Sequence, residues 1–296
     1  MSPEQSWTGT SGRAQHPWWT YHSDRELLAL AKEYPYVAVE HSCIFVRGAP
    51  YELIDFIDDP LRDGVVRNLA GETVPITRHL ETLGIHDAVP LSRRTPVLAY
   101  GSNAAPAQLA RKFGQTGDAV IPVVKADITG IDAVYSAHIT RYGAVPATLA
   151  ESSNTTLHAF ITWLSGDELS IMHESELGRS GAVPGNYVYG ELTGAGVTSD
   201  CFSGGHRLHA YVSQFGALGL GEQPTALDAV VATSRIFASL SKVDVLSCVR
   251  DSISPQHELD DFILDAVRMD GVRRGWSQRL RRSALPDILP CFAERF

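Results

Sequence analysis

Residues 96–114, with the sequence PVLAYGSNAAPAQLARKFG, place a glycine and two small polar residues between an apolar segment and a helical pattern. The apolar residues predict a strand that ends near Tyr100, and the pattern that follows predicts a helix over 106–113. The first turn of a helix has N–H groups without helical partners, and its dipole favours negative charge. The Gly-Ser-Asn turn can therefore hold a carboxylate or a developing oxyanion. The alternative is a turn that only caps the helix.

A carboxylate supplies the second chemical group. In SGDELSIMHESELG, residues 165–178, Ser165 or Asp167 can cap a helix. The spacing of three and four places Leu169, Met172 and Glu176 on one face of that helix. An acid beside apolar side chains is partly desolvated and suited to proton transfer. The alternative for Glu176 is a solvent-facing acid at a helix end.

Other polar residues near this helix are weaker candidates. Glu174 points to a different face from Glu176, and His173 either orients Glu176, binds substrate or is a surface histidine. Ser102 lies outside a G-x-S-x-G motif and has no assignable histidine and acid partners, which argues against a serine nucleophile. Arg141 either pairs with a carboxylate or is a charge at the rim.

Metal ligation has little support in the sequence. His206 and His209 have a spacing compatible with two ligands on a helix, but no third ligand is evident, so we predict no metal. The acidic residues Asp55, Asp58 and Asp59 are followed by Pro60 and are interpreted as a charged helix end.

Composition limits the classes of partner. The chain has 296 residues, a net charge of −9 and scattered Lys and Arg, so no basic face for nucleic acid or anionic membrane is expected. The four cysteines, Cys43, Cys201, Cys248 and Cys291, lie far apart, which is typical of reduced thiols. No leader pattern or membrane span is recognisable. We expect a cytoplasmic protein.

The chain divides into four predicted parts. Residues 1–22 are expected to be a flexible arm, and 23–94 an N-terminal α+β extension. In that extension SDRE, residues 23–26, is a capping box that opens a helix. YVAVEHSCIFVRG predicts a strand or hairpin, and PYELIDFI predicts a second helix. Residues 216–296 form a predicted helical C-terminal region, with helices in 224–240 and 257–271.

Residues 95–215 are rich in predicted strands. The segments TPVLAYG, AVPATLAE, TLHAFITWLS and YVYGELTG are separated by glycines and polar turns. TLHAFITWL is apolar in both alternating sets, which predicts a strand that is buried on both faces. This spacing favours a closed or strongly curved sheet. In the last strand, Tyr187 and Tyr189 share one side.

The order of these motifs resembles the gamma-glutamylcyclotransferase family over about 120 residues. The resemblance rests on AYGSN at 99–103, GAVPATLAES at 143–152, LHAFITWLSGDEL at 157–169, and LSIMHESELG leading to YVYGEL. The family's L-x-x-L-D-x-x-E helix corresponds to Leu169, Met172, His173 and Glu176. Met172 and His173 depart from that pattern, and the glutamate is kept.

The resemblance implies an α+β fold with a small mixed β-barrel of the gamma-glutamylcyclotransferase-like type. It implies that the substrate-binding loop Tyr100, Gly101, Ser102 and Asn103 grips a glutamyl group and stabilises its carbonyl oxygen. Glu176 would be the catalytic acid–base group, and Tyr187 a wall of the pocket. The implied reaction needs no cofactor and releases 5-oxoproline from a gamma-glutamyl amine or amino acid.

Two other classes stay open. One is a hydrolase that uses the same pocket with water as the nucleophile and releases free glutamate or another acid. The other is a non-catalytic small-molecule-binding domain, which would tolerate the loss of Glu176. The extensions on both sides of the barrel could close the pocket, set specificity or form a homo-oligomer, and the sequence leaves these roles open.

Overall fold

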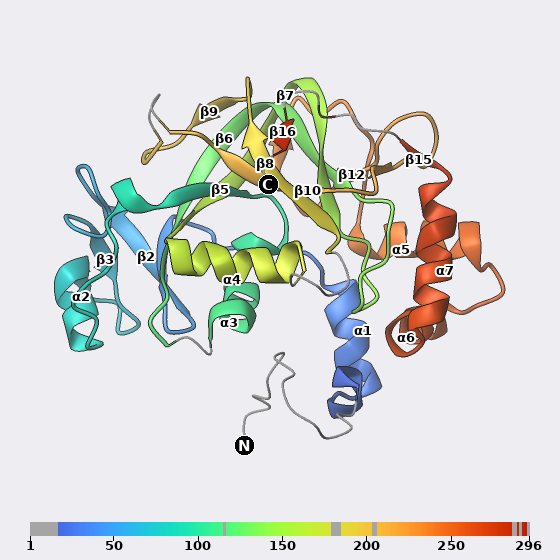
Figure 1. The fold of residues 1–296 in the computed structure, drawn as a ribbon, viewed down its shortest axis with the longest axis horizontal. Coiled ribbons are helices and arrows are strands. Elements are labelled where there is room, and N and C mark those ends of the chain that lie inside the picture. The colour runs from blue at the N-terminus through green and yellow to red at the C-terminus, as the bar shows by residue number, and fades with distance from the viewer. Residues whose placement is uncertain are drawn as a thin grey trace.

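The computed structural model describes residues 17–114, 117–178, 185–202, 206–285, 289 and 292–294. Within them the protein is a mixed α+β structure in which one large, mostly antiparallel sheet is flanked by seven α-helices (Figure 1). The predicted α+β class is confirmed. None of the described helices is long and apolar enough to cross a membrane. The thiols of Cys43, Cys201 and Cys248 are free, and Cys291 lies outside the described residues.

The helices begin and end as follows: α1 Asp24–Lys32, α2 Ile76–Thr82, α3 Pro106–Phe113, α4 Gly166–Glu176, α5 Lys242–Ile253, α6 Leu259–Arg268 and α7 Asp270–Arg281. Short 3-10 helices cover Trp18–Tyr21, Leu91–Arg93 and Ser102–Ala104. The predicted capping box at Ser23 before α1 is present. Of the two predicted caps, Ser165 and Asp167, Ser165 is the N-cap of α4, and it forms a capping box with Glu168. Local sequence therefore sets where these two helices begin.

The longer strands are β1 Cys43–Val46, β2 Ala49–Asp55, β5 Thr95–Ala99, β6 Val120–Tyr135, β7 Ala147–Leu164, β8 Tyr187–Leu192 and β10 His209–Ser213. The shorter strands are β3 Val65–Arg67, β4 Thr73–Pro75, β9 Gly196–Thr198, β11 Ala217–Leu218, β12 Ala226–Leu227, β13 Ala232–Thr233, β14 Ser239–Leu240, β15 Ala284–Leu285 and β16 Phe292–Glu294. The main sheet has the order β16-β8-β10-β5-β7-β6-β1-β2-β3-β4.

Two long strands, β6 and β7, form the centre of the sheet. They pair antiparallel along nearly their whole length, with an irregularity at Thr129 and Gly130. The sequence suggested two separate strands for 144–165, and β7 instead runs through most of this segment as one strand. Leu157, Ile161 and Trp163, on one face of β7, are fully buried. On the other face Leu164 is buried but Phe160 is only partly buried, so the predicted burial on both faces holds at the end of the strand and not along its whole length. The shift in register at Thr129 and Gly130 is of the kind that bends a sheet.

The sheet curves but is open among the described strands. β9 begins at Gly196, soon after β8 ends at Leu192, yet β9 pairs with β6 rather than with β8. No described pairing joins β8 to β9, so the closed barrel predicted for 95–215 is not found. The expected N-terminal extension also joins this sheet, because β1 pairs with β6.

Two predicted helices are wrong. PYELIDFI forms strand β2, because Arg47 and Gly48 adopt left-handed φ values of 47° and 83° and turn the chain back beside β1. Residues 224–240 contain β12, β13 and β14 in place of a helix, since β12 pairs with β6 and β13 with β7. In both cases pairing with a distant or returning strand overrides apolar spacing that resembled a helix.

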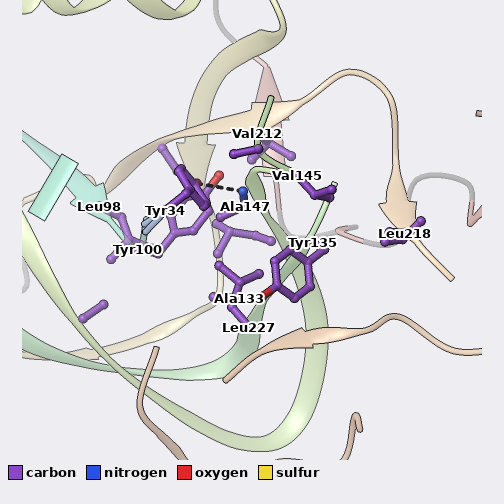
Figure 2. Close-up of a cluster of buried hydrophobic side chains, with 14 of the residues drawn as sticks. Tyr34, Leu98, Tyr100, Ala133, Tyr135, Val145, Ala147, Val212, Leu218 and Leu227 are labelled. Carbon is purple, nitrogen blue, oxygen red and sulfur yellow. Dashed lines mark hydrogen bonds between the residues drawn. The ribbon is translucent and has the colours of Figure 1, made fainter. Parts of the chain in front are cut away.

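The two ends of the described chain pack together. Helix α1 lies against α6, where Lys32 pairs with Asp260 and Arg268 pairs with Asp24 (Figure 1). Residues 1–16 of the predicted arm lie outside the described residues, and Trp18 and Trp19 pack beside α1 and α6. The largest buried cluster extends from Tyr34 and Tyr100 to Tyr135 and Leu227 (Figure 2). Residues from both ends of the chain therefore surround one core.

Candidate active site

The Gly-Ser-Asn turn lies where the sequence predicted it, between strand β5 and helix α3. Gly101 precedes the 3-10 turn Ser102–Ala104, and Pro106 is the first residue of α3. No hydrogen bond within the described residues uses the amide N–H of Gly101, Ser102 or Asn103. These N–H groups are available to an acceptor in the adjoining cavity.

Gly101 fits tightly into its surroundings. A Cβ atom at this position would lie 3.0 Å from the hydroxyl oxygen of Tyr34 and 3.3 Å from the Cβ of Ala147. A side chain here would need the Tyr34 hydroxyl or Ala147 to shift by a few tenths of an ångström, because these gaps are shorter than ordinary packing contacts. Glycine therefore suits the close approach of the main chain to Tyr34.

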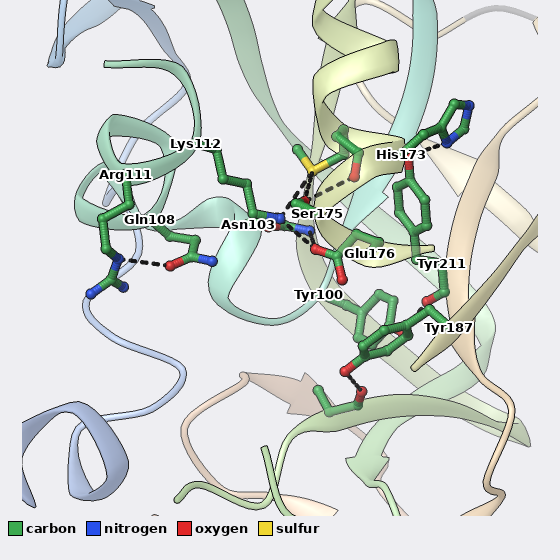
Figure 3. Close-up of polar contacts among 12 residues, drawn as sticks. Tyr100, Asn103, Gln108, Arg111, Lys112, His173, Ser175, Glu176, Tyr187 and Tyr211 are labelled. Carbon is green, nitrogen blue, oxygen red and sulfur yellow. Dashed lines mark hydrogen bonds and ion pairs between the residues drawn. The ribbon is translucent and has the colours of Figure 1, made fainter. Parts of the chain in front are cut away.

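Glu176 is the last residue of α4 and meets the turn from the other side of the cavity. The amide Nδ2 of Asn103 donates a hydrogen bond of 3.1 Å to Oε1 of Glu176. Lys112, in the last turn of α3, forms an ion pair with the same oxygen and donates a 2.8 Å hydrogen bond to Oδ1 of Asn103 (Figure 3). The structure thus brings together Asn103 and Glu176 and adds Lys112, which the sequence analysis missed.

Both contacts of Glu176 use one carboxylate oxygen. Asn103 and Lys112 engage Oε1, and no contact within the described residues engages Oε2. In Figure 3 the carboxylate lies above the rings of Tyr100 and Tyr187. The side chain of Glu176 is 15% exposed, and its carboxylate is anchored at one oxygen while the other has no partner among the described residues.

Tyrosines form the wall beneath Glu176. Tyr187 donates a hydrogen bond of 3.0 Å to the carbonyl of Ala147, and the N–H of Ala147 donates one of 2.8 Å to the hydroxyl of Tyr34. The hydroxyl of Tyr100 donates to the carbonyl of Tyr211. These bonds fix the rings around the main chain of two strands, β7 and β10.

Burial dominates the electrostatics of these tyrosines. Burial, followed by the negative charge of Glu176, raises the pKa of Tyr100 and Tyr211. Burial likewise raises the pKa of Tyr34 and Tyr187 well above the usual value of a phenol. All four rings therefore stay neutral at physiological pH and can act only as neutral hydrogen-bonding groups.

One cavity of about 1690 Å³ contains all the predicted site residues. Tyr100, Gly101, Ser102, Asn103, Glu176 and Tyr187 all line it. Residues that the sequence analysis did not select also line it, among them Tyr34, Lys112, His138 and Tyr211. A smaller cavity of about 750 Å³ over β2 contains none of the predicted site residues. The predicted groups therefore line one cavity.

The other candidates lie in different places. Nδ1 of His173 forms a 2.8 Å hydrogen bond with the hydroxyl of Tyr211 and makes no described contact with Glu176. Tyr189 stacks on His209, which begins strand β10 and does not lie on a helix. Within the described ranges, no group of three His, Cys, Asp or Glu residues is arranged to hold a metal ion. Arg141 lines the cavity.

No family model, curated protein or solved structure matches this chain.

Proposed function

We propose that the cavity is the active site of a cofactor-independent gamma-glutamylcyclotransferase-like enzyme. Its substrate is a gamma-glutamyl compound, and its products are 5-oxoproline and an amine or amino acid. In this proposal, strands β5 to β8 and β10 correspond to the strands of the family's small β-barrel, and the sheet that they form is open among the described strands. The observation that carries the proposal is the meeting of the Gly101–Asn103 turn with Glu176 in one cavity, with Oε2 of the carboxylate unengaged.

The reaction begins with a proton transfer. The α-ammonium of the substrate gives a proton to Oε2 of Glu176, and the free amine attacks its own γ-carbonyl carbon. A C–N bond forms, and the leaving nitrogen takes the proton from Glu176 as its bond to the carbonyl carbon breaks. The ring nitrogen then gives its second proton to Glu176, which passes it to the released amine, so the carboxylate is restored. Because both reacting groups belong to one molecule, effective molarities on the order of 10⁵ M or more are accessible without a cofactor.

The turn supports the charge that develops during the attack. The unpaired N–H groups of Gly101, Ser102 and Asn103 are donors for the carbonyl oxygen as it becomes an oxyanion. Lys112 and Asn103 hold Oε1 of Glu176, which fixes the direction of Oε2. Neutral tyrosine rings beneath the carboxylate exclude water from the reacting groups.

The release of 5-oxoproline tests this function. A panel of gamma-glutamyl amines and amino acids is incubated with the protein, and the first product is identified by mass spectrometry. We expect 5-oxoproline, and in ¹⁸O-labelled water we expect it without label because water never attacks the carbonyl. Acetylation of the α-amine removes the nucleophile and should abolish turnover. Labelled glutamate as the first product would instead establish a hydrolase.

One observation favours a second function, a non-catalytic binding domain. Glu176 is already ion-paired with Lys112, so its charge has a structural partner as well as a proposed chemical task. A binding domain would hold gamma-glutamyl compounds without releasing product. Calorimetric binding of a gamma-glutamyl compound in the absence of any turnover, kept in Glu176→Gln, would favour this alternative.

A further inference from the structure

The cavity has a second chemically distinct wall, formed by arginines. Arg273 and Arg281 of α7 line it together with Arg141 from the segment after β6. The carboxylates that line the same cavity come from α1, the residue that caps its end, and α4: Glu26, Glu33, Glu174 and Glu176. Helix α7 therefore contributes positive charge to a cavity whose proposed reacting acid lies on α4.

Arg281 is the central residue of this wall. Its guanidinium carbon lies 3.4 Å from the centre of the Phe215 ring, and no carboxylate of the described residues pairs with it. Arg273 pairs with Asp270, which also accepts from Arg274 at 2.7 Å. The Asp270 carboxylate thus pairs with both Arg273 and Arg274, while the guanidinium of Arg281 packs on an aromatic ring.

The positive charges lie close enough to act on one another. The surrounding protein, and to a smaller degree the charge of Arg273, lowers the pKa of Arg141 to about 10. Burial, followed by the charges of Arg281 and Arg273, lowers the pKa of His138 to about 3. His138 is therefore neutral, and the cationic character of the wall belongs to the arginines.

His138 adds an unsatisfied polar atom to this wall. It is 1% exposed, it lies 4.9 Å from the Phe215 ring, and its Nδ1 bonds to Ser136 at 2.8 Å. Its Nε2 is buried and has no hydrogen-bond partner among the described residues. Because the Oγ of Ser136 donates to Ser213, Nδ1 of His138 is the donor to Ser136 and the unpaired Nε2 is an acceptor. Nε2 can therefore accept an N–H or O–H of a ligand, while binding of an anionic oxygen falls to the arginines.

We propose that Arg273, Arg281 and Arg141 bind an anionic group, a carboxylate or a phosphate-type group, on the half of the substrate that leaves as the amine. This inference rests on the proposed function. Guanidinium groups suit such oxyanions because they present several N–H donors in a plane. The glutamyl half lies at the Gly101–Asn103 turn and Glu176, which leaves the α7 wall for the other half.

Matched substrate pairs test the inference. Gamma-glutamylglycine is compared with its glycinamide, and gamma-glutamyl-2-aminoethylphosphonate with gamma-glutamylpropylamine, by kcat/KM for 5-oxoproline release. Each pair differs in the anionic group and shares the glutamyl half. We expect the acid to exceed its neutral partner by about tenfold or more, since charge-assisted bonds are this strong. The larger of the two ratios identifies carboxylate or phosphonate as the preferred group.

The variants assign the effect to α7. In Arg281→Gln the ratio of kcat/KM for each acid to kcat/KM for its neutral partner should fall towards one, because only the activity on the acids is lost. Arg282→Gln, on the adjacent residue that does not line the cavity, is the matched control and should keep the ratio. Equal kcat/KM values within both pairs overturn the inference. So does an equal loss on acid and neutral substrate in Arg281→Gln, which would assign the arginines to the glutamyl carboxylate.

A binding measurement separates this inference from the proposed function. Inorganic phosphate and acetate are titrated into the full chain and into both variants by calorimetry. If no substrate yields 5-oxoproline but either anion binds at least about tenfold more weakly to Arg281→Gln than to Arg282→Gln, the reaction is wrong and the anion site stands. If neither anion nor any acidic substrate discriminates the variants, the anion site is wrong.

Discussion

Lys112 and Glu176 come from different helices, α3 and α4, and form an ion pair at the edge of the cavity with side chains only 7% and 15% exposed. A buried pair of this kind gives little net stability, but the removal of one partner leaves an uncompensated charge. This ion pair also joins α3, the helix that follows the Gly-Ser-Asn turn, to α4, the helix that carries the proposed base. It therefore connects the two halves of the candidate site.

Lys112→Met should destabilise the protein more than the same change in a fully exposed lysine. We expect a loss of about 3 kcal/mol in the free energy of unfolding, because Glu176 then lacks its cation. Denaturant titration of Lys112→Met, Glu176→Gln and the double variant measures the coupling. The double variant should be less destabilised than the sum of the single variants, and simple additivity would show that the pair carries no such energy.

Glu176→Gln should reduce turnover by at least about a hundredfold while the fold persists. The side chains are nearly the same size, but the amide cannot take the proton from the substrate ammonium. Glu174→Gln is the control, since Glu174 lies on the same helix and is more exposed. The measurement is kcat for 5-oxoproline release. Unchanged turnover in Glu176→Gln would remove the proposed mechanism.

Gly101→Val should be far more harmful than Ser102→Ala. A Cβ at position 101 would lie 3.0 Å from the Tyr34 hydroxyl, and such overpacking costs about 1–3 kcal/mol and displaces the turn. Ser102→Ala keeps the main-chain N–H groups and should retain most activity. Thermal unfolding and kcat/KM are measured for both. A covalent adduct on Ser102, with Ser102→Ala inactive, would replace this scheme by a serine nucleophile.

His138 should make the protein less stable in mild acid. Burial, then two arginine charges, lowers its folded pKa to about 3, against 6.5 for an ordinary histidine. As the pH falls below 6.5, the unfolded chain binds a proton at this residue and the folded protein does not. Stability from this group is thus complete above pH 6.5 and decreases as the pH falls towards 3, by up to roughly 5 kcal/mol.

His138→Asn tests this assignment. Asparagine does not titrate, and its Nδ2 can donate to Ser136 much as Nδ1 of histidine does. His79 and His173 also have pKa values lowered mainly by burial, but both remain in the variant. The free energy of unfolding is compared at pH 7 and pH 4.5. The variant should lose less stability than the wild type between these values, and an equal loss would assign the acid sensitivity to other groups.

Local signals predicted the parts of the site that depend on local structure. Pro106 fixes the start of α3, and the capping box at Ser165 fixes the start of α4. Asn103 therefore lies just before α3, and Glu176 is the last residue of α4. The shared face of Met172 and Glu176 followed from helical spacing alone. These features need no information from distant parts of the chain.

The remaining features depend on long-range packing. Lys112 is one of two basic residues at the end of α3, and nothing in its neighbourhood indicates a partner 64 positions later on α4. Tyr34 follows α1, which packs against α5 and α6, and the Tyr34 hydroxyl reaches Gly101 while it accepts a hydrogen bond from Ala147 of β7. The positions of β12 and β13 are likewise set by pairing with β6 and β7. Contacts of this range are fixed by tertiary structure, which local periodicity cannot report.

The cavity wall joins Tyr34, near the start of the described chain, to Arg281 of α7, near its end. A growing chain therefore carries the turn and Glu176 long before it carries α7. The cationic wall cannot assemble until α7 has emerged from the ribosome, because domains complete their packing only when all their elements are present. During synthesis the nascent chain contains the residues of the glutamyl half of the proposed site before it contains those of the half that would select its substrate.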